Sequence, residues 1–148
     1  MITKIFKRTF LFVAVSIFSF NLHAADWTMA SGYPKSNFHT QNIIKFIDDV
    51  KSTTSVNINL NPNDTLIKLD AIKTSLQRGQ IPIGEIRLGI YGNEDPMYIL
   101  AGLPFIAPDY SSAWLLKDVQ MEYLQEKFDK KGLMILYTAP WPGQGFYT

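Results

Sequence analysis

The chain contains no cysteine among its 148 residues. This absence excludes disulfides, zinc sites built from thiolates and catalysis by a thiol nucleophile. The sequence has only two histidines, His23 and His39, so a metal site made of several histidines is excluded as well. Core burial must therefore hold the fold together, and with 14% aromatic and 18% charged residues an apolar core is available.

The chain also lacks a large excess of charge of either sign. Its net charge is +1, and removal of the first 24 residues, which carry three basic side chains and no acidic one, leaves −2 over 124 residues. A nucleic-acid-binding domain normally carries a basic patch, so this balance argues against one. No repeat and no linker rich in Pro, Ser or Gly interrupts residues 25–148, which are expected to form one unit.

A single apolar run stands near the N-terminus, and nothing later is comparable. Lys4, Lys7 and Arg8 precede an apolar stretch over 10–20, and Ala24 supplies a small residue before a polar chain. This order predicts a secretory signal peptide over 1–24, cleaved near Ala24. A membrane anchor is the alternative, but about eleven apolar residues span roughly 16 Å, short of a bilayer core of about 30 Å.

Strand patterns alternate with helix patterns through the rest of the chain. Strands are expected at 27–30, 56–60, 83–90, 133–138 and 146–148, and helices at about 36–53, 65–79 and 109–131, with one helical turn near 97–100. Each helix should bury one apolar stripe. The three stripes are Ile43, Phe46, Ile47 and Val50; then Leu66, Leu69, Ile72 and Leu76; then Leu116, Val119, Tyr123, Leu124 and Phe128.

This alternation predicts an α/β fold with a mostly parallel sheet flanked by helices. In such sheets ligands bind beyond the carboxyl ends of the strands. The segments expected there are 31–39, 61–65, 89–96 and 140–145, which are rich in polar side chains, aromatic residues and glycine.

Several short motifs follow one another in a fixed order along residues 25–148. They are Ala30-Ser31-Gly32-Tyr33-Pro34, Phe38-His39-Thr40-Gln41-Asn42, Gly79-Gln80, Gly84-Glu85, Gly92-Asn93-Glu94-Asp95-Pro96, Leu103-Pro104-Phe105 and Pro140-Trp141-Pro142-Gly143-Gln144-Gly145. In this order they resemble the solute-binding proteins of tripartite ATP-independent periplasmic (TRAP) transporters, of the dicarboxylate-binding type. The resemblance implies a periplasmic-binding-protein fold, in which two α/β lobes close on an organic acid.

The same resemblance implies a transport role without catalysis and without a cofactor. The ligand would be captured in the periplasm and passed to the TRAP-type membrane permease, which an ion gradient drives. Family members are about twice as long as this chain and hold the ligand carboxylate with an arginine of the second lobe. That arginine would lie beyond Thr148, so residues 25–148 are expected to be an incomplete receptor consisting of the first lobe.

Seven residues are candidates for contact with a ligand. Glu85 and Arg87 alternate along a predicted strand and therefore share a face, where they would meet either a ligand or only each other as a surface ion pair. Tyr33 precedes the first predicted helix. Phe38, His39 and Asn42 lie in its first turns, where free N–H groups attract anions.

Some candidate residues also have simpler explanations. His39 also suits an ordinary cap or surface position, and Trp141 would either cover a ligand or fill the interior of the lobe. Asn93-Glu94-Asp95 lacks the spaced oxygen ligands of a calcium loop and is predicted to be a capped turn. Other possibilities remain open: a stand-alone sensor or interaction domain, a fragment without function, or an exported hydrolase. The hydrolase is disfavoured because no Gly-x-Ser-x-Gly motif accompanies His39.

Overall fold

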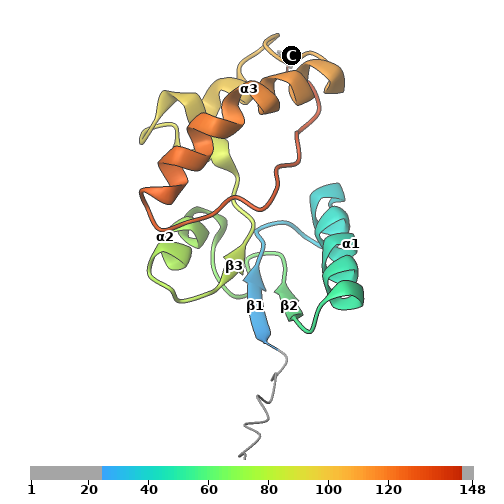
Figure 1. The fold of residues 1–148 in the computed structure, drawn as a ribbon. Coiled ribbons are helices and arrows are strands. Elements are labelled where there is room, and N and C mark those ends of the chain that lie inside the picture. The colour runs from blue at the N-terminus through green and yellow to red at the C-terminus, as the bar shows by residue number, and fades with distance from the viewer. Residues whose placement is uncertain (1–24, 145–148) are drawn as a thin grey trace, which may run out of the picture.

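In the computed structural model, which describes residues 25–144, a three-stranded parallel sheet lies between helices (Figure 1). Strand β1 (Asp26–Ala30) is central, between β2 (Asn57–Asn61) and β3 (Ile83–Gly84). In the register, Met29 stands opposite Leu60 on one side and Ile83 on the other. The α/β prediction is confirmed, whereas the predicted signal peptide and the predicted strand at 146–148 lie outside the described residues.

Helix α1 (Phe38–Thr53) covers one face of this sheet, as its apolar period predicts. Asn37 caps the helix, because its side-chain oxygen accepts a hydrogen bond of 2.8 Å from the backbone N–H of His39. The predicted stripe of this helix packs against Met29, Ile58 and Ile83, so this part of the core was correctly predicted.

The opposite face of the sheet is covered by α2 (Ile72–Gln77), which follows the 3-10 turn η1 (Leu69–Ala71). Ile72 is fully buried against Ala30, and Ala30 points away from Met29 because side chains alternate along a strand. The helix is shorter than the predicted span of 65–79. Residues 62–68 form a turn instead, since Asn63 and Asp64 adopt positive φ angles of 59° and 57°. Leu66, placed on the buried stripe, is exposed.

The predicted strand over 83–90 is wrong beyond its second residue. Only Ile83 and Gly84 pair with β1, although the N–H of Glu85 still donates to the carbonyl of Ala30 at 2.9 Å. Strand β1 ends at Ala30, so the chain after Glu85 has no backbone to pair with. It forms the 3-10 helices η2 (Leu88–Tyr91) and η3 (Pro96–Gly102) instead, and the latter confirms the expected helical turn.

Helix α3 (Tyr110–Asp129) begins at Asp109, whose carboxylate accepts the N–H of Ser112 at 2.8 Å. Its second half packs on η2 and η3, where Leu124 and Phe128 meet two buried tyrosines. Fewer residues of the described chain pack against its first half. Val119, predicted to be buried, is 72% exposed, so this part of the predicted stripe is wrong.

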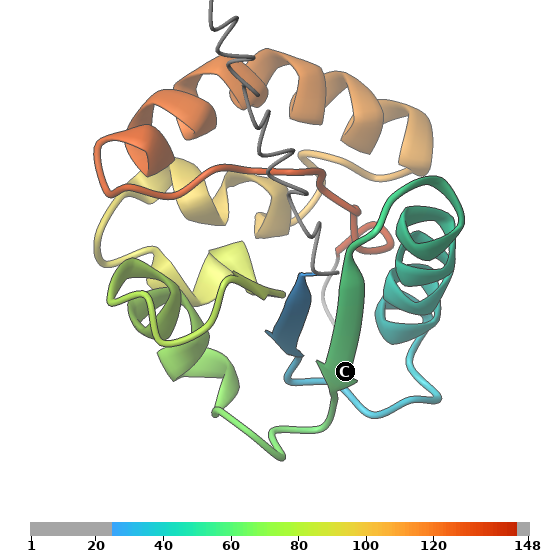
Figure 2. The same cartoon turned by 60° about the horizontal axis from the view of Figure 1, so that its bottom comes forward.

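Residues 133–144 run as an extended segment between α3 and the layer that contains the sheet (Figures 1 and 2). The strand predicted at 133–138 is not formed, because the segment joins no ladder in the described chain. The N–H of Phe105 donates to the carbonyl of Gln144 at 3.3 Å and ties the end of the segment to the preceding loop. Gly143 passes so close to the Pro108 carbonyl that a Cβ would clash. Within residues 25–144, no helix is long and apolar enough to span a membrane.

Candidate functional site

Four of the predicted ligand residues come together in one aromatic cluster, made of Tyr33, Phe38, His39 and Trp141. The imidazole of His39 lies 4.1 Å from the ring of Phe38 and 4.4 Å from that of Trp141, measured between centroids. The Tyr33 ring meets Trp141 edge-on at 5.4 Å. Aromatic rings at these separations pack favourably and present both apolar faces and polar edges, as small-molecule sites often do.

The fold places this cluster at the carboxyl ends of the parallel strands. Tyr33 follows the end of β1, and Phe38 and His39 form the first turn of α1. Trp141 comes from the extended segment, which crosses above the strand tips in Figure 1. This edge is where open α/β sheets bind ligands, so the position agrees with the strand-end rule.

Three buried polar atoms of the described chain have no hydrogen-bond partner, and two of them belong to this cluster. They are the hydroxyl of Tyr33, Nε2 of His39 and the hydroxyl of Thr138. His39 is only 5% exposed, and its burial lowers the pKa of the imidazole, which favours the neutral ring. Buried polar groups are normally paired, so the two unpaired atoms distinguish this cluster from most of the described interior.

Glu85 forms the acidic end of the same region. Its Oε2 accepts a hydrogen bond of 2.5 Å from the hydroxyl of Ser31, which is fully buried. Its other oxygen, Oε1, receives no hydrogen bond from residues 25–144. Burial raises the pKa of Glu85, and the bond from Ser31 opposes that rise.

Arg87 lies near this region without pairing with Glu85. No salt bridge joins the two within the described chain, so the predicted surface ion pair is not formed. The shared strand face that motivated both residues is also absent, because Arg87 immediately precedes η2. Burial raises the pKa of Tyr33, while the charge of Arg87 lowers it and that of Glu85 raises it. Both charges therefore act on the aromatic cluster.

Asn42 does not join the aromatic cluster but lines a groove of about 800 Å³ between α1 and α3. The other residues of this groove are Lys45, Phe46, Asp49, Trp114, Lys117, Met121 and 135–140. Thr138 belongs to it, so one of the unpaired hydroxyls belongs to the groove wall.

Sequence reasoning did not single out Ser31, which donates to Glu85, or Thr138, which lines the groove between α1 and α3. Ser31 stands at the end of a predicted strand, a position that could have drawn attention to it. Thr138 lay in a predicted strand, and nothing in the pattern distinguished it from its neighbours.

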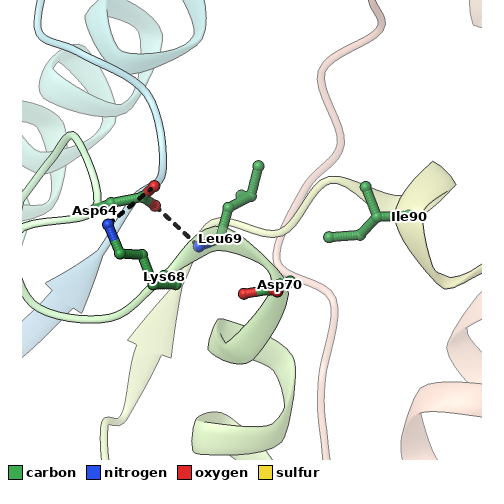
Figure 3. A pocket seen from close by; sticks show the side chains of 5 residues that line it. All are labelled: Asp64, Lys68, Leu69, Asp70 and Ile90. Carbon is green, nitrogen blue, oxygen red and sulfur yellow. Dashed lines mark hydrogen bonds and ion pairs between the residues drawn. The ribbon is translucent and has the colours of Figure 1, made fainter.

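A second, shallow hollow of about 350 Å³ lies beside η1 and is lined by Asp64, Lys68, Leu69, Asp70 and Ile90 (Figure 3). Asp64 already accepts the N–H of Leu69 at 2.9 Å and pairs with Lys68 at 4.0 Å. Because its main polar groups satisfy one another, this hollow offers a ligand less than the aromatic cluster does.

The Asn93-Glu94-Asp95 motif is a capped turn, as predicted. The carboxylate of Asp95 accepts the N–H of Met97 at 3.0 Å and begins η3. Glu94 pairs with Lys73 and Lys131. Within residues 25–144, no group of three acidic or histidine side chains is arranged to hold a metal ion.

No protein-family model matches the chain, and no curated protein matches it at a significant level. Solved structures do match it. The extracytoplasmic solute receptor DctP6 of Bordetella pertussis, which binds pyroglutamic acid, is 39% identical with a TM-score of 0.77, over 80% of this chain and 40% of the receptor. DctP7 of the same organism, which also binds pyroglutamic acid, is 34% identical with a TM-score of 0.76 over the same shares.

A third match is a TRAP solute-binding protein from a marine metagenome, specific for pyroglutamate. It is 32% identical with a TM-score of 0.77, over 82% of this chain and 40% of its own. The chain thus spans about 40% of the length of these three receptors. Other TRAP solute-binding proteins below 25% identity, such as one from Sulfitobacter at 18% with a TM-score of 0.61, show the fold alone.

Proposed function

Because this chain belongs to the solute-binding proteins of TRAP transporters, we propose that it provides one lobe of a receptor for a small organic acid. The receptors that it matches serve binding and transport and catalyse no reaction, so the role is not enzymatic. The observation that carries the proposal is the aromatic cluster with two unpaired buried polar atoms, Tyr33 OH and His39 Nε2. A carboxylic acid that carries its own donors and acceptors would satisfy both.

The preferred ligand in this proposal is a monocarboxylic acid of the pyroglutamate kind. The three receptors above 30% identity all bind pyroglutamate. A receptor from Rhodoferax ferrireducens with bound malonate, a dicarboxylate, is only 21% identical. Dicarboxylates, expected from the sequence motifs, are therefore the second choice.

The proposal includes a location and a partner. Residues 1–24 would direct export as a signal peptide, and residues 25–148 would act in the periplasm as the first lobe. The acid would pass to TRAP-type permease subunits in the membrane. Closure of a second lobe over the cluster would exclude water and strengthen the charge pairing of the carboxylate.

A titration of the purified protein tests the binding role. Pyroglutamate, malonate, erythronate and galacturonate would be added at millimolar concentration while the thermal midpoint and the tryptophan indole NMR signals are recorded. A ligand that binds only the folded state raises the midpoint by mass action. We expect pyroglutamate to raise it most and to shift the indole signal of Trp141.

Two tryptophans provide a matched pair of variants. Trp114 and Trp141 are 48% and 39% exposed, but only Trp141 belongs to the aromatic cluster. Trp141→Phe should weaken binding, whereas Trp114→Phe should leave it unchanged. If Trp114→Phe alone weakened binding, the ligand would lie in the groove between α1 and α3. If no acid produced a shift, the binding proposal would be overturned.

A further inference from the structure

Glu85 is linked to the aromatic cluster through Ser31, whose hydroxyl donates to the Glu85 carboxylate and accepts the backbone N–H of Tyr33 at 3.3 Å, and this position bears on the choice of ligand. We propose that Glu85 selects acids with an N–H or O–H donor next to a single carboxylate, and rejects acids with a second carboxylate. This inference rests on the proposed function, since it concerns the ligand of the same site.

Two hydrogen bonds hold Glu85 in place, one at its backbone and one at its side-chain carboxylate. Its backbone N–H donates a hydrogen bond to the carbonyl of Ala30, and its Oε2 accepts a hydrogen bond from the hydroxyl of Ser31. Ser31 is itself fixed, because its N–H donates to the carbonyl of Asn61 at 3.0 Å and its carbonyl accepts the N–H of Asp64 at 3.2 Å. A carboxylate positioned in this way can discriminate between ligands, since it cannot easily move aside.

Glu85 acts on both layers that form the site. Its charge raises the pKa of Tyr33, which precedes α1, and that of Tyr137, which belongs to the extended segment. The Tyr33 ring meets Trp141 at 5.4 Å, whereas Tyr137 packs against Phe46 at 5.2 Å in the groove between α1 and α3. Arg87 supplies a positive charge that acts on Tyr33 and is a counter-charge for one carboxylate of a ligand.

The free oxygen of Glu85 determines what chemistry fits at this end. An ionised carboxylate only accepts hydrogen bonds, and Oε1 has none from the described chain. A ligand N–H or O–H would satisfy it with a charge-assisted bond. A second ligand carboxylate at the same place would set two negative charges against each other in a partly buried region, which is unfavourable.

Three acids distinguish the contribution of the ligand N–H from that of a second ligand carboxylate, and the comparison uses the unmodified protein. Pyroglutamate has one carboxylate and one ring N–H, N-methylpyroglutamate lacks the N–H, and glutarate has the same number of carbon atoms with two carboxylates. Dissociation constants would be obtained by NMR titration. Loss of a hydrogen bond to a charged group weakens binding by about tenfold or more, so we expect pyroglutamate to bind at least about tenfold more tightly than either of the others.

Glu85→Gln removes the charge and keeps the shape. The ratio of the dissociation constants of glutarate and pyroglutamate should fall by about tenfold, through weaker binding of pyroglutamate and tighter binding of glutarate. Glu122→Gln on the exposed surface of α3 makes the same change in net charge and should leave the ratio unchanged. An NMR spectrum of each variant verifies its fold, and the three-acid comparison does not depend on any variant.

The possible results are distinct. Equal affinity for pyroglutamate and glutarate in the unmodified protein, or an unchanged ratio in Glu85→Gln, would overturn this inference and leave the binding function standing. Absence of binding by all three acids would overturn both. If N-methylpyroglutamate bound as tightly as pyroglutamate, Glu85 would not recognise the N–H donor of the ligand. That result would also overturn the inference.

Discussion

Two polar regions of this molecule differ in how completely their atoms are paired. In the lysine–carboxylate network, formed by Lys73, Glu94, Asp95, Tyr123, Lys127 and Lys131, both carboxylates have partners. In the aromatic cluster, Tyr33 OH and His39 Nε2 have none. The network binds α2, η3 and α3 to one another and needs nothing further. Under the proposed function a ligand would complete the cluster, which would distinguish polar groups that hold a fold from those that serve binding.

The strongest test of the network is Glu94→Gln. Lys73 is 2% exposed, and without the carboxylate its ammonium keeps the ring of Tyr91, 4.0 Å away, as its main partner. Breaking a fully buried pair costs about 3–5 kcal/mol, and the partial exposure of Glu94 reduces this to about 2 kcal/mol. Urea denaturation would measure the loss. A loss no larger than that of Glu122→Gln would show that the network contributes little.

A matched pair of tyrosine variants compares the two regions directly. The hydroxyl of Tyr123 donates to Asp95 at 2.6 Å, so Tyr123→Phe should lower the free energy of unfolding by about 1.5 kcal/mol. The hydroxyl of Tyr33 has no partner, so Tyr33→Phe should cost no stability while it weakens ligand binding. Equal losses from the two substitutions in urea denaturation would remove the distinction between the regions.

Glu85→Gln should stabilise the protein slightly at neutral pH. The pKa of Glu85 is raised above 4.5, so the folded state binds this proton more tightly than the unfolded state does. Its contribution to stability is present below that value and lost as the pH rises through the raised pKa. We expect a gain of less than about 1 kcal/mol in the variant at pH 7. Thermal melts from pH 4 to pH 8 should show the gain shrinking in acid, and a gain that grew in acid would contradict the assignment.

The smallest effect concerns His39. Its pKa is lowered below 6.5 by burial, so the unfolded state takes up a proton at a higher pH than the folded state does. The contribution of the neutral ring to stability is full above pH 6.5 and decreases as the pH falls towards the folded pKa. His39→Gln should lack this decrease. Melts of both proteins between pH 7 and pH 5 would reveal it as a converging difference, and parallel curves would exclude it.

The parts of the fold that the sequence predicted well are those determined by local pattern. The stripe from Ile43 to Val50 has helical spacing and faces the sheet. The segment after the first strand supplies Tyr33 and Phe38, and both rings meet that of Trp141. Trp141 was placed among the candidates because it follows a predicted strand. That strand is not formed, but the segment still carries the residue to the strand ends, where it packs against Tyr33 and His39. Its role in ligand binding stays a prediction.

The errors arise where distant parts of the chain decide the local structure. The apolar alternation of Ile86 and Leu88 favours a strand, but β1 ends at Ala30 and leaves them no partner. Val119 has the spacing of a buried residue, yet the described chain does not reach over that part of α3. The unpaired state of Tyr33 and Thr138 depends on three-dimensional packing, which no periodicity in a single sequence expresses.

The position of Trp141 against Tyr33 also determines the order of events when this protein folds. The two rings meet at 5.4 Å although one stands near the start of the described chain and the other near its end. Contacts between such distant residues close a long loop and form late, after helices and neighbouring strands. A chain that emerges N-terminus first would therefore form this cluster only after Trp141 had emerged, later than the strands and α1.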